Sequence, residues 1–85
     1  MNKYIDYDIH NGLTVLKCAV MNILYSLDSR EITNYIFNPY ISSTFIESCM
    51  NQCEWTSLEN SIWKTPLGEL YYFDKSTKSI KKYES

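Results

Sequence analysis

The residues able to do nucleophilic chemistry in this sequence are few: one histidine, three cysteines and scattered acids. A catalytic nucleophile needs a base within hydrogen-bond reach and a third group that orients the base. His10 with one of the cysteines, and Asp8 as the orienting acid, would meet that need, but no Gly-rich oxyanion loop or strained nucleophile turn accompanies them. We therefore expect His10 to be a solvated polar residue and the protein not to be an enzyme.

A metal site is the second chemistry that these residue types allow. Cys49 and Cys53 are four residues apart and share one face of a helix, and with Cys18 and His10 they would supply four zinc ligands. Zinc sites of small domains usually use Cys-x-x-Cys turns, and both cysteines lie on an apolar stripe where a free thiol behaves as a small hydrophobe. We expect core packing and no metal. Two isolated glycines cannot build a phosphate-binding loop, so we expect no cofactor.

Aromatic residues are the more informative group, with eight tyrosines, three phenylalanines and two tryptophans. Tyrosine and tryptophan dominate binding hot spots, and this number exceeds what a small core rich in Ile and Leu needs. In a strand, Tyr71 and Phe73 share one face and Tyr72 points to the other, so a tyrosine lies on whichever face is exposed. The site that we predict for protein binding consists of Trp55, Trp63, Tyr71, Tyr83, Lys81 and Lys82.

The elements that position these residues begin with a predicted strand. Lys3 to His10 alternate between apolar and polar side chains, which is the pattern of a half-buried strand. For residues 11–17 two interpretations remain open. Asn11-Gly12 is a hairpin signal, whereas apolar residues at spacings of three and four predict a helix; they are Leu13, Leu16, Val20, Leu24 and Leu27. We adopt the helix because it accounts for more residues.

Two more helices and three strands are predicted after this helix. Ser29 is a candidate N-cap for a helix over Arg30 to Phe37, and Asn38 with Pro39 at the first helical position predicts a third helix to about Cys53. Strand-like runs at 61–65, 69–73 and 79–83 are separated by turn residues and predict an antiparallel meander. The predicted fold is one α+β domain over 1–85, mainly helical over 1–55 and a β-meander over 56–85.

Composition narrows the class of partner. The 45% hydrophobic content fits one compact core, and eight basic against ten acidic residues leave a net charge of −2. A nucleic-acid binder usually carries a basic cluster, and here the cluster is only the Lys81-Lys82 pair, so nucleic acid is disfavoured. No apolar run approaches the roughly 18 residues of a membrane span, and the acidic N-terminal stretch is unlike a signal peptide. We expect an intracellular, cytoplasmic protein with no membrane partner.

Amino-acid usage adds a hint about origin. The sequence is rich in Ile, Asn, Lys and Tyr, whose codons are rich in A and T. That bias suggests an AT-rich genome such as that of a virus, phage or mobile element, in which case the compartment would be the host cytoplasm. An odd number of cysteines fits a reducing compartment.

The segment from Trp63 to Tyr83 resembles the WW domain family. The similarity consists of Gly68, the pair Tyr71-Tyr72, and Asp74 where the family usually has Asn. The second tryptophan and the proline that follows it are missing, and Tyr83 stands near the tryptophan's place. In that family the first tyrosine of the pair and the second tryptophan grip a proline-rich peptide in polyproline II conformation. The resemblance implies a groove between Tyr71 and Tyr83.

These observations predict a small non-enzymatic protein-binding factor. Its form would be an adaptor or inhibitor that masks a partner's surface, and a virus- or phage-encoded antagonist of a host protein is the specific version that the codon bias suggests. Two alternatives stay open, a degenerate WW-like binder of proline-rich peptides and a small protein that binds single-stranded nucleic acid. Salt-dependent binding that weakens when Lys81 and Lys82 are neutralised would identify the latter.

Overall fold

The computed structural model describes residues 2–84, with side chains from residue 12 onward. Its elements in chain order are α1 (Asn2–Asp28), β1 (Asn34–Ile36), α2 (Ser43–Gln52), β2 (Thr56–Ser57), β3 (Ile62–Lys64), β4 (Leu70–Asp74) and β5 (Ser79–Lys82). The strands form one antiparallel sheet in the order β1-β5-β4-β3-β2. The predicted α+β class is confirmed, although residues 2–84 contain two helices rather than three and a five-stranded sheet rather than a three-stranded meander.

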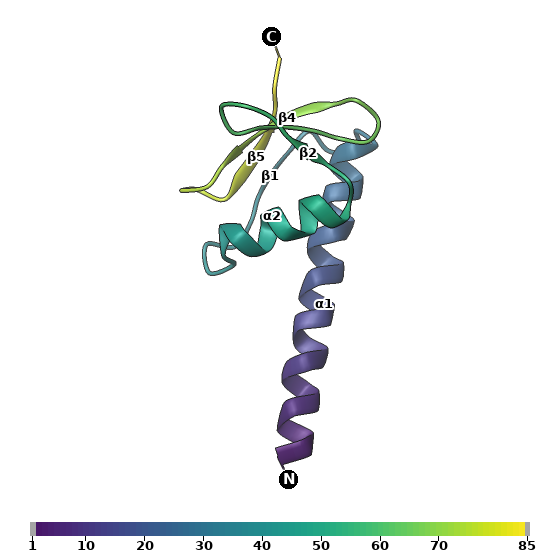
Figure 1. Ribbon diagram of the computed structural model, residues 1–85, viewed down its shortest axis with the longest axis vertical. Helices are drawn as coiled ribbons and strands as arrows, with labels where there is room; N and C mark the ends of the chain where they lie inside the picture. Colours follow the sequence, from purple (N-terminus) through teal and green to yellow (C-terminus); the bar gives the residue numbers. More distant parts are fainter. Residues whose placement is uncertain (1, 85) are drawn as a thin grey trace.

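The two helices lie on one side of the sheet (Figure 1). Helix α1 runs along the long axis of the molecule, α2 crosses its C-terminal half, and the sheet lies beyond them, while the N-terminal half of α1 extends away from the rest. The resulting shape is elongated, with principal extents of 54 × 24 × 19 Å. In the described part of the chain, no helix combines the length and apolar character that crossing a membrane requires.

Helix α1 corrects the prediction for the N-terminal segment. The strand predicted over residues 3–10 is wrong, because these residues continue the helix. Ile5, Ile9 and Leu13 recur every four residues as well as fitting an alternating pattern, and a short apolar run of this kind does not distinguish the two periods. Residues 11 and 12 lie within α1, so the helix prediction for 11–17 is confirmed and the hairpin alternative is wrong.

The helix predicted over Arg30 to Phe37 is also wrong. Helix α1 ends in a Schellman motif, in which the N–H of Glu31 donates to the Ser26 carbonyl at 2.9 Å and that of Arg30 donates to the Leu27 carbonyl at 3.2 Å. Arg30 takes the left-handed conformation at φ 68°, so the chain leaves the helix there and Ser29 caps nothing that follows. The segment then forms edge strand β1, which pairs with β5.

Helix α2 confirms the later part of the predicted third helix but not its start. Ser42 is the N-cap, accepting a hydrogen bond from the Phe45 N–H at 3.1 Å. Asn38 instead caps a turn, because its side chain accepts from the N–H of Tyr40 at 2.9 Å. The apolar stripe predicted to carry Cys49 and Cys53 is confirmed: both are buried together with Ile46, and Ile41 and Phe45 pack against the core.

The three predicted C-terminal strands are confirmed as β3, β4 and β5, and each contributes aromatic or aliphatic side chains to the core. Gly68, at φ 91°, occupies a left-handed position in the β3–β4 turn that other residues adopt only with strain. The core between sheet and helices consists of Val20, Leu24, Leu27, Phe37, Ile46, Cys49, Met50, Cys53, Trp55, Trp63, Tyr71, Phe73 and Ile80. The sheet is therefore held on the helices by one layer of large side chains.

Candidate functional site

The face of the sheet directed away from the helices carries a regular array of side chains. Strand pairing aligns Ile62, Tyr72 and Lys81 in one row across the sheet. In the next row, Lys64 pairs with Leu70, whose carbonyl accepts the N–H of Tyr83 at 2.9 Å. Because side chains alternate along a strand, both rows point away from the core residues of β3, β4 and β5. We call this surface the outer face; it consists of Ile62, Lys64, Leu70, Tyr72, Lys81 and Tyr83.

The outer face is partly apolar and open to solvent. Tyr72 is 41% and Tyr83 38% exposed, whereas Ile62 and Leu70 are half-buried. A shallow hollow lies at this end of the sheet, lined by Leu58, Ile62, Leu70 and Tyr83 together with residues 57 and 59. Two aromatic rings therefore stand beside an aliphatic depression that neither helix covers.

The charges on the outer face are not neutralised within the molecule. Among the described residues, the side-chain ammonium groups of Lys64 and Lys81 have no ion pair or hydrogen bond. The three other lysines of this half of the chain, Lys75, Lys78 and Lys82, each contact a carboxylate or a backbone carbonyl. Tyr72 is thus bordered by two ammonium groups that remain free to meet a ligand.

Three of the six residues that the sequence predicts for binding lie in the core instead. Trp55 is 3%, Trp63 4% and Tyr71 0% exposed, so none of them is available to a partner. Trp55 and Tyr71 stack with their ring centroids 5.6 Å apart. The prediction of an outer surface built on these rings needs correction, because they form the layer that joins the sheet to the helices.

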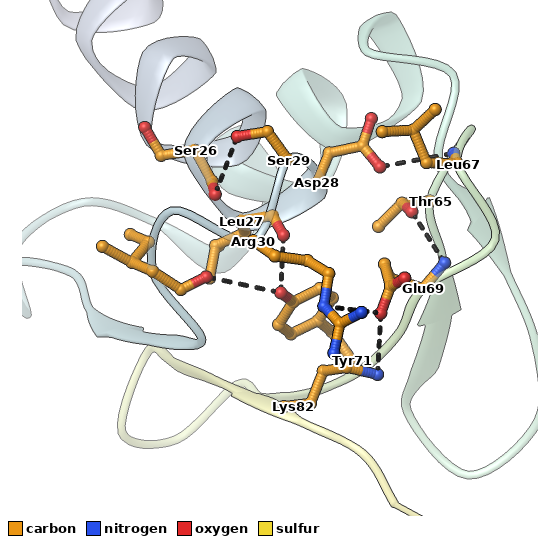
Figure 2. Close-up of polar contacts among 11 residues, drawn as sticks. Ser26, Leu27, Asp28, Ser29, Arg30, Thr65, Leu67, Glu69, Tyr71 and Lys82 are labelled. Atoms are coloured by element: carbon orange, nitrogen blue, oxygen red, sulfur yellow. Dashed lines mark hydrogen bonds and ion pairs between the residues drawn. The ribbon is translucent and has the colours of Figure 1, made fainter.

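Tyr71 also links the sheet to the end of α1, as Figure 2 shows. Its hydroxyl donates to the Leu27 carbonyl at 2.5 Å. Burial raises the pKa of Tyr71 above its ordinary value, which keeps the phenol protonated and able to donate. Lys82 lies on the same side, with its ammonium 3.1 Å from the Glu69 carboxylate and 5.7 Å from the Tyr71 ring centroid. Lys82 therefore belongs to a structural network and not to the outer face.

Two of the predicted residues, Lys81 and Tyr83, do lie on the outer face, and four members of that face were missed. The alternation along β4 could have identified Tyr72. The structure confirms this alternation, since Tyr71 and Phe73 are buried and Tyr72 is exposed. The same alternation places Leu70 with Tyr72 and sets Ile62 and Lys64 opposite to Trp63, but only the register between strands brings these side chains beside one another. The groove implied by the WW resemblance is not formed, since Tyr71 and Tyr83 lie on opposite faces of the sheet.

Cys49 and Cys53 are core packing residues, as predicted. Cys49 is 1% and Cys53 6% exposed, and burial raises the pKa of both thiols, which disfavours the thiolate. Cys18 is exposed on α1. Where side chains are described, no three His, Cys, Asp or Glu residues gather as metal ligands do. The candidate base and ligand His10 lies outside the residues whose side chains are described.

Comparison of the chain with protein-family models, curated proteins and solved structures finds no match.

Proposed function

We propose that this protein is a small non-enzymatic protein-binding factor, an adaptor or inhibitor that masks a partner's surface with its outer face. The observation that supports it is the presence of two exposed tyrosines, Tyr72 and Tyr83, beside two unpaired lysines on a sheet face that no helix covers. This replaces the buried aromatic residues of the sequence-based prediction with residues that are accessible.

The composition of this face matches what protein interfaces require. Tyrosine offers an apolar ring and a polar tip at a small cost in side-chain entropy, and interfaces combine an apolar centre with a polar rim. The hollow beside Leu70 supplies the apolar centre, and Lys64 and Lys81 supply charged edges. Ile36 on β1, 71% exposed, extends the same side of the sheet to its edge.

The proposal is tested by co-purification from the native host with quantitative mass spectrometry. Tyr72→Ala removes an exposed ring and should abolish recovery of the partner while leaving the fold intact by circular dichroism. Tyr40→Ala is the matched control, because Tyr40 is 96% exposed and lies on the loop before α2. Recovery of the same proteins with both variants, or of only the monomer with the unaltered chain, would contradict the proposal.

Single-stranded nucleic acid is a second candidate ligand for the same face. Exposed aromatic rings on a sheet, flanked by free lysines, are the features on which bases stack and phosphates bind. The net charge of −2 argues against it. A fluorescent oligothymidylate titrated at several salt concentrations decides between them, because nucleic-acid binding would weaken steeply with salt and with Lys64→Gln and Lys81→Gln.

The remaining forms of the proposal have less support. Proline-rich ligands need two aromatic walls facing one groove, and the pair assigned by the WW resemblance lies on opposite faces of the sheet. An antagonist encoded by a virus or phage is a specific version that rests on amino-acid usage alone.

A further inference from the structure

The two free lysines of the outer face stand at opposite corners of its array. Lys64 is on β3, in the row of Leu70 and Tyr83, and Lys81 is on β5, in the row of Ile62 and Tyr72. The line joining the two lysines therefore crosses β4 between Leu70 and Tyr72. Ile62 and Tyr83 occupy the other two corners.

The register sets the separation of these two charges. Two steps between neighbouring strands, at about 4.8 Å each, and a two-residue offset of about 6.8 Å along the strands put the lysine Cα atoms roughly 12 Å apart. In an extended peptide, residues i and i+4 are about 13 Å apart, and residues i, i+2 and i+4 project to the same side. An extended segment can thus present three side chains to the outer face at matching intervals.

We propose, building on the protein-binding function above, that the partner presents an extended acidic segment of the form acid-x-apolar-x-acid. Its two carboxylates pair with Lys64 and Lys81, and the apolar side chain midway lies between Leu70 and Tyr72. Charge complementarity selects this occupant, because two exposed ammonium groups without internal partners gain ion pairs only from an acidic ligand.

One acid of β4 shares the outer face: Asp74 projects to the same side as Tyr72, but its carboxylate accepts hydrogen bonds from Ser76 and Thr77 in the β4–β5 turn, beyond the row of Tyr72 and Lys81. Glu59 and Glu84 are exposed, but Glu59 lies near the Ile62 corner, where its carbonyl accepts the Ile62 N–H at 3.3 Å, and Glu84 follows Tyr83. Glu59 is therefore beside the Ile62 corner, whereas Glu84 lines a hollow with Lys81 and Lys82 at the β1–β5 edge, beyond the end of the array. Glu59 disfavours a segment that would place a carboxylate at the Ile62 corner.

The test selects a phage-displayed library of random 12-residue peptides against the full chain. The expected result is enrichment of peptides with two acidic residues four apart and an apolar residue between them. A synthetic peptide of the enriched sequence is then titrated by fluorescence anisotropy. Lys64→Glu and Lys81→Glu should each weaken binding by about tenfold, because each places like charges together. Lys75→Glu, the same charge change at an exposed lysine of the β4–β5 turn, should change it less than about twofold.

The outcomes separate this inference from the protein-binding function. Enriched peptides without the acid pair, whose binding is lost in Tyr72→Ala, would overturn the acidic-segment proposal and retain protein binding by the outer face. Peptides indifferent to Tyr72→Ala, or no enrichment at all, would overturn both. Tight binding of oligothymidylate in place of any peptide would overturn both in favour of nucleic acid.

Discussion

Replacing Tyr71 with phenylalanine isolates one buried hydrogen bond between the sheet and α1. The substitution keeps the ring that stacks on Trp55 and removes the hydroxyl, which donates to the Leu27 carbonyl at 2.5 Å and makes a longer contact of 3.5 Å with the Ile32 carbonyl. The Leu27 carbonyl retains only the Arg30 N–H, at 3.2 Å, within the described residues. Losing a buried hydrogen bond whose acceptor keeps another donor costs about 1 to 1.5 kcal/mol of unfolding free energy. For a domain of this length, that lowers the melting temperature by about 4 to 8 °C per kcal/mol.

The assay is urea unfolding followed by tryptophan fluorescence, since Trp55 and Trp63 are buried and their emission shifts to longer wavelength on unfolding. Tyr72→Phe is the matched control, because Tyr72 is the next residue and its hydroxyl makes no hydrogen bond with described residues. We expect its effect to lie within about 0.5 kcal/mol of zero. Equal losses in the two variants would refute the role assigned to the Tyr71 hydroxyl.

The raised pKa of Tyr71 also predicts the response to alkali. In the unfolded chain the phenol ionises near its ordinary pKa of about 10, whereas burial keeps it protonated to a higher pH in the folded state. Its contribution to stability is therefore complete below pH 10 and is lost as the pH rises from there through the folded-state pKa. Urea midpoints between pH 9 and 11 should fall less steeply in Tyr71→Phe than in the unaltered protein.

Three further outcomes are expected. Gly12→Ala should stabilise the protein by about 0.5 to 1 kcal/mol, because Gly12 lies within α1, whereas Gly68→Ala should destabilise it by at least about 1 kcal/mol, because the φ of Gly68 is 91°. Thermal melts of both variants test this, and a loss of stability in Gly12→Ala would contradict it. An alkylating reagent should modify Cys18 quickly, but Cys49 and Cys53 only in denaturant, because both are buried. Mass spectrometry of the alkylated native protein should therefore show one adduct. Hydrogen bonds from Ser76 and Thr77 lower the pKa of Asp74, so the β4–β5 turn should stay ordered until the pH falls through that lowered pKa. An NMR titration of the Asp74 carboxyl measures this pKa, and a midpoint near the ordinary value of about 4 would contradict the expectation.

Elements whose signals are local could be predicted from the sequence. The apolar spacing from Leu13 to Leu27 predicts the core-facing stripe of α1, and the turn at Pro66-Leu67-Gly68 separates β3 from β4 as expected. The predicted helix boundaries were wrong where a local sequence signal fits both a helix and a turn. Asn38-Pro39 is compatible with a helix start and with a turn, and Ser42, four residues on, makes the actual cap.

The candidate site could be predicted only in part, because exposure is not a local property. Alternation along β4 already separates Tyr72 from Tyr71 and Phe73, but it does not say which group meets the helices. Strand β1 has no local pattern of its own and is defined by pairing of Tyr35 with Ile80, far along the chain. The free lysines are recognised only once the ion pairs of the other lysines are known.

By itself the sequence determined the α+β class, the three C-terminal strands, the apolar faces of both helices and the alternation that leaves one tyrosine outward, since each depends on neighbours within a few residues. The tertiary structure alone decided that Trp55, Trp63 and Tyr71 are buried and that Lys64 and Lys81 border an open face. The physical reason is that burial and charge pairing arise from contacts between segments distant in the chain. Which side of the sheet is free to bind follows from where the helices pack.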